Sequence, residues 1–184
     1  KYVDVTGNGT VNADDMTYLG LGNVPEIVYG INGSVSWNRF DMSFLLQGAE
    51  RVQVYLNGGI ITPYFNQGGL PQLWVNESWT SDNVNARYPR LVNTVHNFPT
   101  IDVPGVGTYV YDASYLRLKN IEIGYNLPKT LLSKARIEAL RIYASAQNLF
   151  TISDVPQIDP ENTNSQGWTY PQMKAFNIGL TLQF

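Results

Sequence analysis

Alternation of apolar and polar residues with a period of two runs through five segments of this 184-residue sequence. In residues 27–37, Ile31, Val35 and Trp37 fall on one side of the chain and Ser34 falls on the other. Successive side chains of a β-strand point to opposite faces, so this period predicts strands with one apolar and one polar face. The predicted strands cover residues 27–37, 40–47, about 114–127, about 138–151 and about 173–184. The chain is therefore expected to be all-β and antiparallel.

The connections between these segments alternate between short and long. Asn38-Arg39 predicts a tight hairpin, and residues 128–136 are a second short break with room for one helical turn. Residues 57–112 and 152–172 are long, rich in Gly, Pro, Asn and aromatic residues, and without sustained periodicity. Tight periplasmic turns alternating with long extracellular loops are typical of membrane barrels, whereas a compact soluble domain seldom contains loops of this length.

The composition excludes several classes of protein. The chain has no cysteine and one histidine, His96, which excludes a disulfide scaffold, a thiolate zinc site and an imidazole cluster. A formal charge of −3 offers no basic stripe, so nucleic acid is not an expected partner. Charged residues make up only 15% of the chain, against about 25% in an average soluble domain. No apolar run is long enough for a transmembrane helix, but a membrane strand needs only about 9–11 alternating residues.

Aromatic residues are placed at both ends of the apolar stripes. Four lie beside the short turns or at the chain end, and two more lie eight residues back along the strands. Eight residues at ~3.3 Å each and a ~40° tilt rise roughly 20 Å, close to the apolar band between the aromatic girdles of an outer-membrane barrel. The four are Trp37, Phe40, Tyr125 and Phe184, and the two are Tyr29 and Phe176.

A soluble sandwich or a lipocalin-like barrel is the alternative, because alternation does not say which face meets lipid. The opposite faces carry Gly, Asn, Ser, Gln, Thr and Glu with few charges, which indicates a wide polar lumen. Five strands cannot close a membrane barrel, which needs an even number from 8 upward. Lys1 starts inside an apparent loop and no signal peptide precedes it, so we expect the C-terminal end of a larger mature protein.

One motif has the spacing of a calcium loop. Counted from Asp4, oxygen-bearing side chains fall at positions 1, 3, 5, 9 and 12, a glycine falls at 6 and a backbone carbonyl at 7. Calcium takes six to eight hard oxygens around a sharp turn. The alternative is an ion-free turn rich in Asp, Asn and Gly. The candidate ligands are Asp4, Thr6, Asn8, Asp15 and the carbonyl of Thr10, and their low charge predicts weak affinity.

The long loops contain further candidates. Their aromatic residues could stack on sugars or, as we expect, pack the loops against their own strands. The carboxylate pairs Asp102 with Asp112 and Asp159 with Glu161 lie in loops that do not set the separation needed for acid–base catalysis, so no enzyme is predicted. The aromatic residues are Tyr64, Phe65, Trp74, Trp79, Tyr88, Tyr109, Tyr111 and Trp168.

Several segments together resemble the end of TonB-dependent outer-membrane transporters of the SusC/RagA family. The most specific are Tyr-Leu-Arg-Leu-Lys-Asn-Ile at 115–121 and Gln-Asn-Leu-Phe at 147–150. The others include the Asp4–Asp15 motif, Phe40-Asp41-Met42-Ser43, Tyr88-Pro89-Arg90, Asp159-Pro160-Glu161 and the terminal Phe184. Asn8 departs from the Asp that is usual in the family's loop.

The resemblance implies a barrel of about 22 strands with an N-terminal plug, of which this chain supplies the last five strands. It implies import of glycans or peptides across the outer membrane of a Gram-negative bacterium, driven through a TonB complex, with a SusD-like surface lipoprotein as a lid. Residues 1–26 would be an extracellular loop and residues 27–184 barrel strands and loops, with plug and TonB box outside the chain. A secreted carbohydrate-binding module and a passive porin remain alternatives.

The last strand carries a further resemblance. Phe176, Leu182 and Phe184 lie on its apolar face, and the chain ends in a free aromatic carboxy-terminus. This resembles the signal by which outer-membrane proteins are recognised for insertion. The alternative is that Phe184 only anchors the strand in an aromatic girdle.

Overall fold

The computed structural model describes residues 3–18, 20–91, 109–132, 137–162, 164, 166, 169–170 and 172–184. It divides into two compact units. The first comprises Lys1–Pro25, Arg51–Ala113 and Asp154–Tyr170, and the second comprises Glu26–Glu50, Ser114–Ser153 and Pro171–Phe184. We call them the loop unit and the strand unit.

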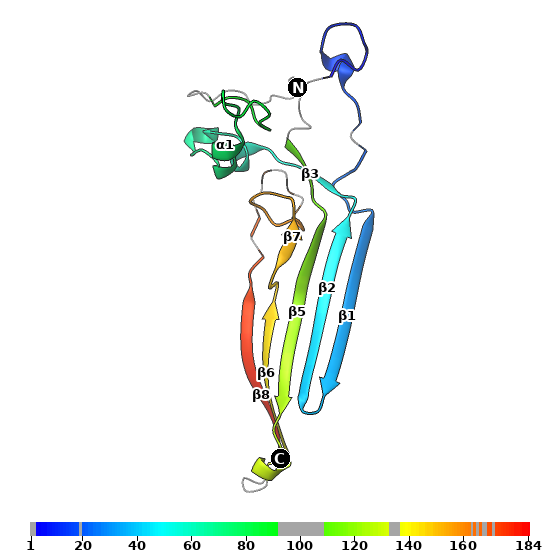
Figure 1. Ribbon diagram of the computed structural model, residues 1–184, viewed down its shortest axis with the longest axis vertical. Helices are drawn as coiled ribbons and strands as arrows, with labels where there is room; N and C mark the ends of the chain where they lie inside the picture. Colours follow the sequence, from blue (N-terminus) through cyan, green and yellow to red (C-terminus); the bar gives the residue numbers. More distant parts are fainter. Residues whose placement is uncertain are drawn as a thin grey trace. The chain divides into compact units, whose positions relative to one another are not determined.

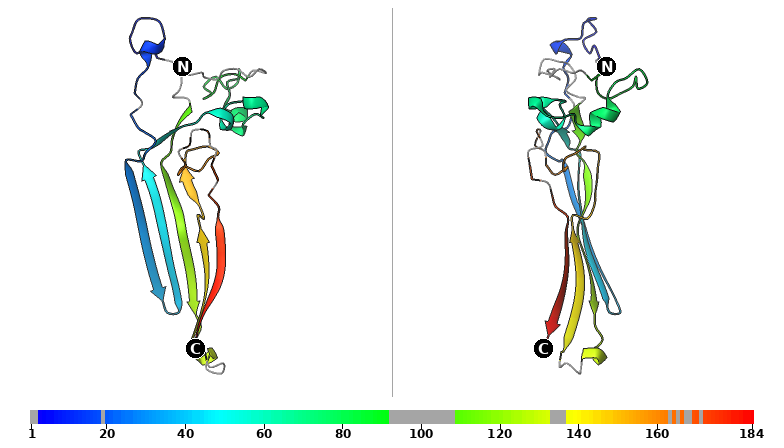
Figure 2. Two further views of the ribbon diagram at one scale, coloured as in Figure 1. Left: turned by 180° about the vertical axis from the view of Figure 1, so that it is seen from behind. Right: turned by 90° about the vertical axis from the view of Figure 1, so that its left-hand side faces the viewer.

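The strand unit is an antiparallel sheet of five long strands in one twisted layer (Figures 1 and 2). Each predicted strand is present. Their order across the sheet is β1-β2-β5-β6-β8, and neither edge closes on the other. The strands are β1 (Ile27–Trp37), β2 (Phe40–Glu50), β5 (Tyr115–Asn126), β6 (Ala139–Gln147) and β8 (Ala175–Gln183).

The predicted fourth strand, 138–151, is wrong in one respect, because it is two strands. β6 ends at Gln147, and β7 (Thr151–Ser153) begins after a break and pairs with β5. Asn148 adopts the left-handed region with φ 51°, which interrupts the extended backbone. Of the short breaks, Asn38-Arg39 is the predicted hairpin, with Trp37 opposite Phe40, and the helical turn is α2 (Lys129–Leu132).

A β-bulge in β5 reverses the faces that strict alternation predicts for the residues before Lys119. Leu45 pairs with Asn120 but Leu46 pairs with Leu118, so Lys119 is the extra residue. Strict alternation would put Arg117 on the same face as Ile121. The bulge instead places Arg117 opposite Gln47 on the polar face.

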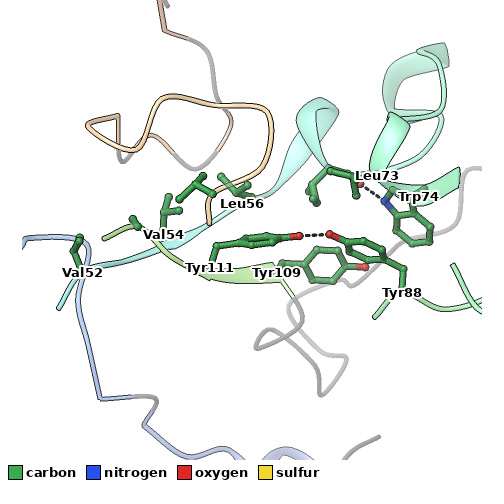
Figure 3. Close-up of a cluster of buried hydrophobic side chains, with 11 residues drawn as sticks. Val52, Val54, Leu56, Leu73, Trp74, Tyr88, Tyr109 and Tyr111 are labelled. Carbon is green, nitrogen blue, oxygen red and sulfur yellow. Dashed lines mark hydrogen bonds between the residues drawn. The ribbon is translucent and has the colours of Figure 1, made fainter. Parts of the chain in front are cut away.

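The buried core lies in the loop unit (Figure 3). Trp74 is fully buried, stacks on Tyr88 with ring centroids 4.6 Å apart, and donates from Nε1 to the carbonyl of Ile61 at 2.6 Å. The hydroxyls of Tyr88 and Tyr111 are hydrogen-bonded to each other, and burial raises the pKa of Tyr88. The core residues are Val52, Val54, Leu56, Ile61, Leu73, Trp74, Tyr88, Tyr109, Tyr111, Ala113 and Val155.

The loop unit also contains several short elements. They are η1 (Ala13–Asp15), β3 (Gln53–Tyr55), η2 (Gly58–Ile60), η3 (Phe65–Gln67), α1 (Gln72–Glu77) and β4 (Val110–Asp112), with β3 and β4 paired. The loop aromatics were expected to pack the loops against their own strands, whereas Trp74, Tyr88, Tyr109 and Tyr111 are buried together in this core of the loop unit. None of the helices in the described residues combines the length and apolarity needed to cross a membrane.

Candidate functional site

The apolar face of the long strands is exposed rather than buried. Its most exposed residues leave between 41% (Leu182) and 86% (Ile178) of their surface accessible, whereas Leu118 and Ala146 on the same face are buried. Soluble monomers rarely expose contiguous apolar patches of more than a few hundred Å². The face is therefore built for an apolar surrounding. Its exposed members are Ile27, Ile31, Val35, Trp37, Phe40, Ile123, Ile142, Phe176, Ile178, Leu180 and Leu182.

An aromatic row borders this face at the hairpin end. Trp37 pairs with Phe40, and Phe40 pairs with Tyr125, with ring centroids 4.7 Å apart and an interplanar angle of 47°. At the other end of β1, the hydroxyl of Tyr29 hydrogen-bonds to Glu50 at 3.4 Å. The register thus brings the predicted rim aromatics of three strands together.

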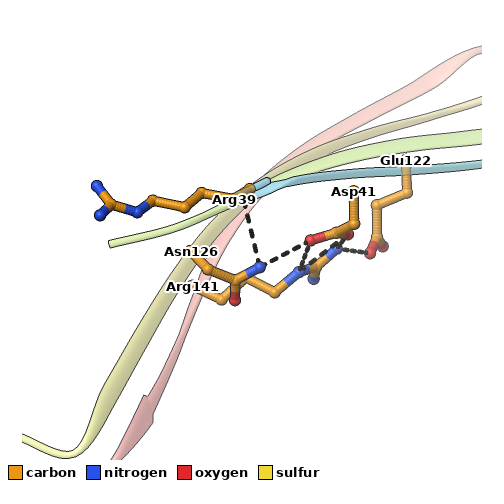
Figure 4. A network of polar contacts seen from close by, with 5 residues as sticks. All are labelled: Arg39, Asp41, Glu122, Asn126 and Arg141. Carbon is orange, nitrogen blue, oxygen red and sulfur yellow. Dashed lines mark hydrogen bonds and ion pairs between the residues drawn. The ribbon is translucent and has the colours of Figure 1, made fainter. Parts of the chain in front are cut away.

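The polar face carries a hydrogen-bonded ion-pair network across three strands (Figure 4). Arg141 of β6 donates from Nε to both carboxylate oxygens of Asp41, at 3.1 and 3.2 Å, and from Nη2 to Oδ2 of the same residue. Its Nη2 also donates to Oε1 of Glu122 at 2.7 Å. Asn126 donates from Nδ2 to Asp41 at 3.1 Å. Charge-assisted bonds of this kind fix three strands against one another at this point.

The sequence placed each member of this network on a polar face but did not join them. Asp41 and Glu122 belong to different strands, and Arg141 reaches both only because of the pairing register. The signal that could have found them is one basic and two acidic residues on polar faces that otherwise have few charges.

The candidate calcium loop folds around its two terminal carboxylates. Asp15 Oδ1 accepts from the amides of Val5 and Thr6, both at 2.9 Å, and Oδ2 accepts from the amide of Asn12 at 2.9 Å. These bonds hold the pKa of Asp15 at about 2, below its ordinary 3.8, with the Thr6 amide the largest contributor. Asp4 accepts from the amides of Gly7 and Gly9, both at 2.7 Å.

Three of the predicted calcium ligands lie together. The Thr6 hydroxyl is 3.2 Å from Asp4 Oδ1 and 3.0 Å from Asp15 Oδ1. Asn8 Oδ1 accepts from the amide of Thr10 at 2.8 Å, so its oxygen also faces the loop backbone. Within the described ranges, no group of three or more His, Cys, Asp or Glu side chains is placed to hold a metal. A cation here would rest on two carboxylates and neutral oxygens.

The other candidates take separate places. Phe176 and Leu182 are exposed on the apolar face of β8, and Phe184 follows the strand with 83% of its surface exposed. Asp159 accepts from the amide of Glu161 at 2.9 Å, as in a turn. Trp79 is 41% exposed. His96, Asp102 and Trp168 lie outside the described residues.

Comparison with curated proteins finds relatives over the whole chain. It is 33% identical over 198 residues to TonB-dependent receptor P3 of Formosa agariphila. It is 29% identical over 192 residues to TonB-dependent receptor SusC of Bacteroides thetaiotaomicron. Both alignments cover 100% of this chain, but only 19% and 17% of those proteins. The chain thus spans less than a fifth of the length of these relatives. No protein-family model matches it.

Comparison with solved structures agrees. The RagAB peptide importer in its closed-closed state superposes with a TM-score of 0.73 and 26% identity. The match covers 100% of this chain and 20% of that one. A second structure of the RagAB peptide transporter gives a TM-score of 0.70. The unclosed antiparallel sheet accordingly corresponds to part of a barrel. By sequence and by fold, the chain matches a segment of TonB-dependent receptors of the SusC/RagA type over its whole length.

Proposed function

We propose that the chain forms the C-terminal part of the membrane-spanning barrel of an outer-membrane importer in a Gram-negative bacterium. The observation that supports this best is the contrast between the two faces of one sheet. One face exposes a continuous set of apolar side chains, and the other carries the Arg141 network among hydroxyl and amide groups. In such a barrel, lipid covers the first face, and the second face lines the polar interior that the plug would occupy.

For the whole protein we propose active import of oligosaccharides or peptides, without chemistry on the substrate. The relatives support this, since they are TonB-dependent receptors and a peptide importer. A TonB complex would supply the energy through the part of the protein outside this chain. A SusD-like surface lipoprotein would close the barrel from outside. A secreted carbohydrate-binding module is a poorer explanation, because it gives no reason for the exposed apolar face.

We also propose that calcium binds the loop of residues 4–15 through Asp4, Thr6, Asn8, Asp15 and the Thr10 carbonyl. The position of the Thr6 hydroxyl between two carboxylates supports the site. Two carboxylates give a low ligand charge, so the affinity should suit the millimolar calcium outside a cell.

Paired cysteine variants of the full-length receptor test the membrane assignment. The chain has no cysteine, so each new thiol is unique within these residues. Ile178→Cys lies on the apolar face of β8 and Asn177→Cys on its polar face. We expect a sulfonated, water-soluble maleimide to label Asn177→Cys, and Ile178→Cys to react only with a lipid-soluble maleimide. Equal labelling of both by the water-soluble reagent would contradict the proposal.

Uptake measurements test the import activity. Cells that carry or lack the receptor gene would be given fluorescent oligosaccharides and peptides. Receptor-dependent uptake that stops when TonB is removed is the expected result. Uptake that continues without TonB would indicate the passive porin instead.

A further inference from the structure

The turn at Asn8-Gly9 combines a reactive dipeptide with hydrogen bonds that favour its reaction. An asparagine followed by a glycine can close a ring, because the glycine nitrogen attacks the side-chain amide carbon and glycine has no side chain to obstruct it. Asn8 and Gly9 are both exposed, and Gly9 has φ 80°, in the left-handed region that favours glycine. Apart from its neighbours in the chain, no atom of the described residues lies within 4 Å of the position that a β-carbon on Gly9 would take.

The attacking nitrogen has a proton acceptor in place. The amide of Gly9 donates to Oδ2 of Asp4 at 2.7 Å. The other oxygen of this carboxylate, Oδ1, accepts from the amides of Gly7 at 2.7 Å and Asn8 at 3.2 Å, so the turn fixes the carboxylate in this position. An amide nitrogen attacks only as it gives up its proton, and a positioned acceptor lowers the barrier to that step.

The carbonyl oxygen of the Asn8 side chain has a hydrogen-bond donor in place. Its Oδ1 accepts from the amide of Thr10 at 2.8 Å. When a nitrogen adds to the amide carbon, negative charge develops on this oxygen, and a backbone N–H aimed at it stabilises that charge. The same hydrogen bond closes a turn around Gly9, which holds the Asn8 side chain along the backbone that contains the attacking nitrogen.

The sequence contains the same dipeptide at two further places, which serve as comparisons. Asn32-Gly33 lies within β1, where both residues are paired with β2, and the side chains of a paired strand stand away from the backbone. Asn57-Gly58 begins η2, and the buried Oδ1 of Asn57 accepts no hydrogen bond within the described part of the chain. Among these three described dipeptides, Asn8-Gly9 alone has both the acceptor and the donor.

We propose that Asn8 is a site of self-catalysed deamidation in the folded receptor. A bond forms between the Gly9 nitrogen and Cγ of Asn8, and the bond from Cγ to Nδ2 breaks, which gives a succinimide ring. The Gly9 proton passes by way of Asp4 to Nδ2, which leaves as ammonia. A water molecule then opens the ring at either carbonyl and gives aspartate or isoaspartate. The reaction does not depend on the import function.

Deamidation changes the charge of the loop of residues 4–15 as the protein ages. Both products add a negative charge. In the aspartate form a third carboxylate joins those of Asp4 and Asp15, and the calcium affinity of such loops depends on the number of charged ligands. Where calcium binds as proposed above, this form would hold it more tightly than the newly made receptor.

The test follows the purified full-length receptor during incubation in calcium-free buffer made with water enriched in heavy oxygen. The label marks molecules that are hydrolysed during the incubation, and peptide mapping by mass spectrometry measures the conversion of Asn8, Asn32 and Asn57. We expect Asn8 to react at least about tenfold faster than the other two in the folded receptor, a small part of what a positioned acid–base group contributes. In receptor unfolded in denaturant, the three rates should become similar.

A pair of variants tests the role of Asp4. Asp4→Asn keeps the size of the side chain but removes the charged acceptor, so conversion of Asn8 should slow at least about tenfold. Asp14→Asn is the matched control, because the amide of Gly9 donates to Asp4 and not to Asp14, and it should leave the rate unchanged. If Asp4→Asn disorders the loop, the rate should still fall, to the value of the unfolded receptor.

Three results would overturn the proposal. The first is a folded receptor in which Asn8 reacts no faster than Asn32 and Asn57. The second is an advantage of Asn8 that persists in denaturant, because the reactivity would then belong to the local sequence and not to the folded turn. The third is unchanged conversion of Asn8 in Asp4→Asn.

Discussion

The guanidinium of Arg141 lies directly over the α-carbon of Gly124 on the neighbouring strand. A methyl group on Gly124 would overlap Nε, Cζ and Nη2 of Arg141. Gly124 pairs with Asp41 on its other side, so Arg141 must cross this position to reach the Asp41 carboxylate. A glycine is needed here for the close approach of a side chain, since its backbone angles are ordinary for a strand.

Gly124→Ala should therefore displace Arg141 and separate it from Asp41 and Glu122. We expect the full-length barrel to unfold at a lower temperature. Samples heated to increasing temperatures and run on gels in detergent should lose the compact, fast-migrating form at a lower temperature than wild type. Gly30→Ala is the matched control, because a methyl group there meets only the Leu46 carbonyl at 3.8 Å. The same loss of heat resistance in both variants would show that the Arg141 crossing is irrelevant.

Charge on the apolar face should impair assembly. Leu180→Arg and Ile123→Arg place a cation where lipid is expected, at a cost of ~2–4 kcal/mol near the midplane. The level of folded receptor in outer-membrane fractions measures the effect. Asn177→Arg, on the polar face of β8, should be tolerated. Thr181→Arg is a poorer control, because Thr181 is opposite Arg141 and like charges directly opposite destabilise a sheet. Equal tolerance at Leu180 and Asn177 would contradict a lipid-facing surface.

Calcium should protect the loop of residues 4–15 from proteolysis. Tyr18 is 84% exposed, so chymotryptic cleavage after it reports on the adjoining loop. Millimolar calcium should slow this cleavage, followed by mass spectrometry, in wild type and in Asp14→Ala. In the variant with both Asp4→Ala and Asp15→Ala, cleavage should be faster and independent of calcium. If wild type is cleaved at the same rate with and without calcium, the calcium proposal is contradicted and the loop is an ion-free turn.

The same loop should lose order in acid. The pKa of Asp15 is depressed from 3.8 to about 2, so its carboxylate stabilises the fold fully above about pH 3.8 and this stabilisation is lost as the pH falls through about 2. Hydrogen exchange of the Val5, Thr6 and Asn12 amides, corrected for intrinsic rates, should accelerate over this window. Asp15→Asn should show faster exchange already at pH 5 and little further change in acid. Acid acceleration persisting in Asp15→Asn would point to another group.

Deletion of Phe184 should separate a role in insertion from a role in anchoring. If Phe184 belongs to an insertion signal, the deleted receptor accumulates unfolded in the periplasm, while inserted molecules keep wild-type heat resistance. Phe40→Ala is the control, because it removes a rim aromatic that packs against Tyr125 but lies outside the last strand. That variant should reach the membrane normally and unfold at a lower temperature. If the Phe184 deletion instead reaches the membrane normally and unfolds at a lower temperature, as expected for Phe40→Ala, Phe184 acts only as an anchor.

The long strands could be predicted because alternation is a local property, and a sheet with unlike faces imposes it on every strand. The bulge at Lys119 could not, since it depends on which residues of β2 lie opposite. The Arg141 network could be predicted only in part, because it too depends on which residues lie opposite one another. Its members were on the expected face, but their proximity depends on the register of three strands.

The loop core was beyond prediction for another reason. Trp74 and Val155 pack in one cluster although they are far apart in the sequence, and neither segment has a period that marks a buried face. Aromatic content alone indicated packing without indicating partners. The calcium motif was predictable as a turn, because Asp, Asn and Gly satisfy backbone amides locally.

The shared core of the loop unit restricts how such receptors can diversify. Val52 and Val155 belong to one cluster, and the amide of Gln53 donates to the carbonyl of Gly22 at 2.8 Å, so three separate stretches of sequence depend on one another. A new surface specificity cannot be acquired by exchanging one loop at a time without opening this core. Recombination between receptors, in nature or in engineering, should succeed when residues 3–25, 51–113 and 154–170 are inherited as one cassette.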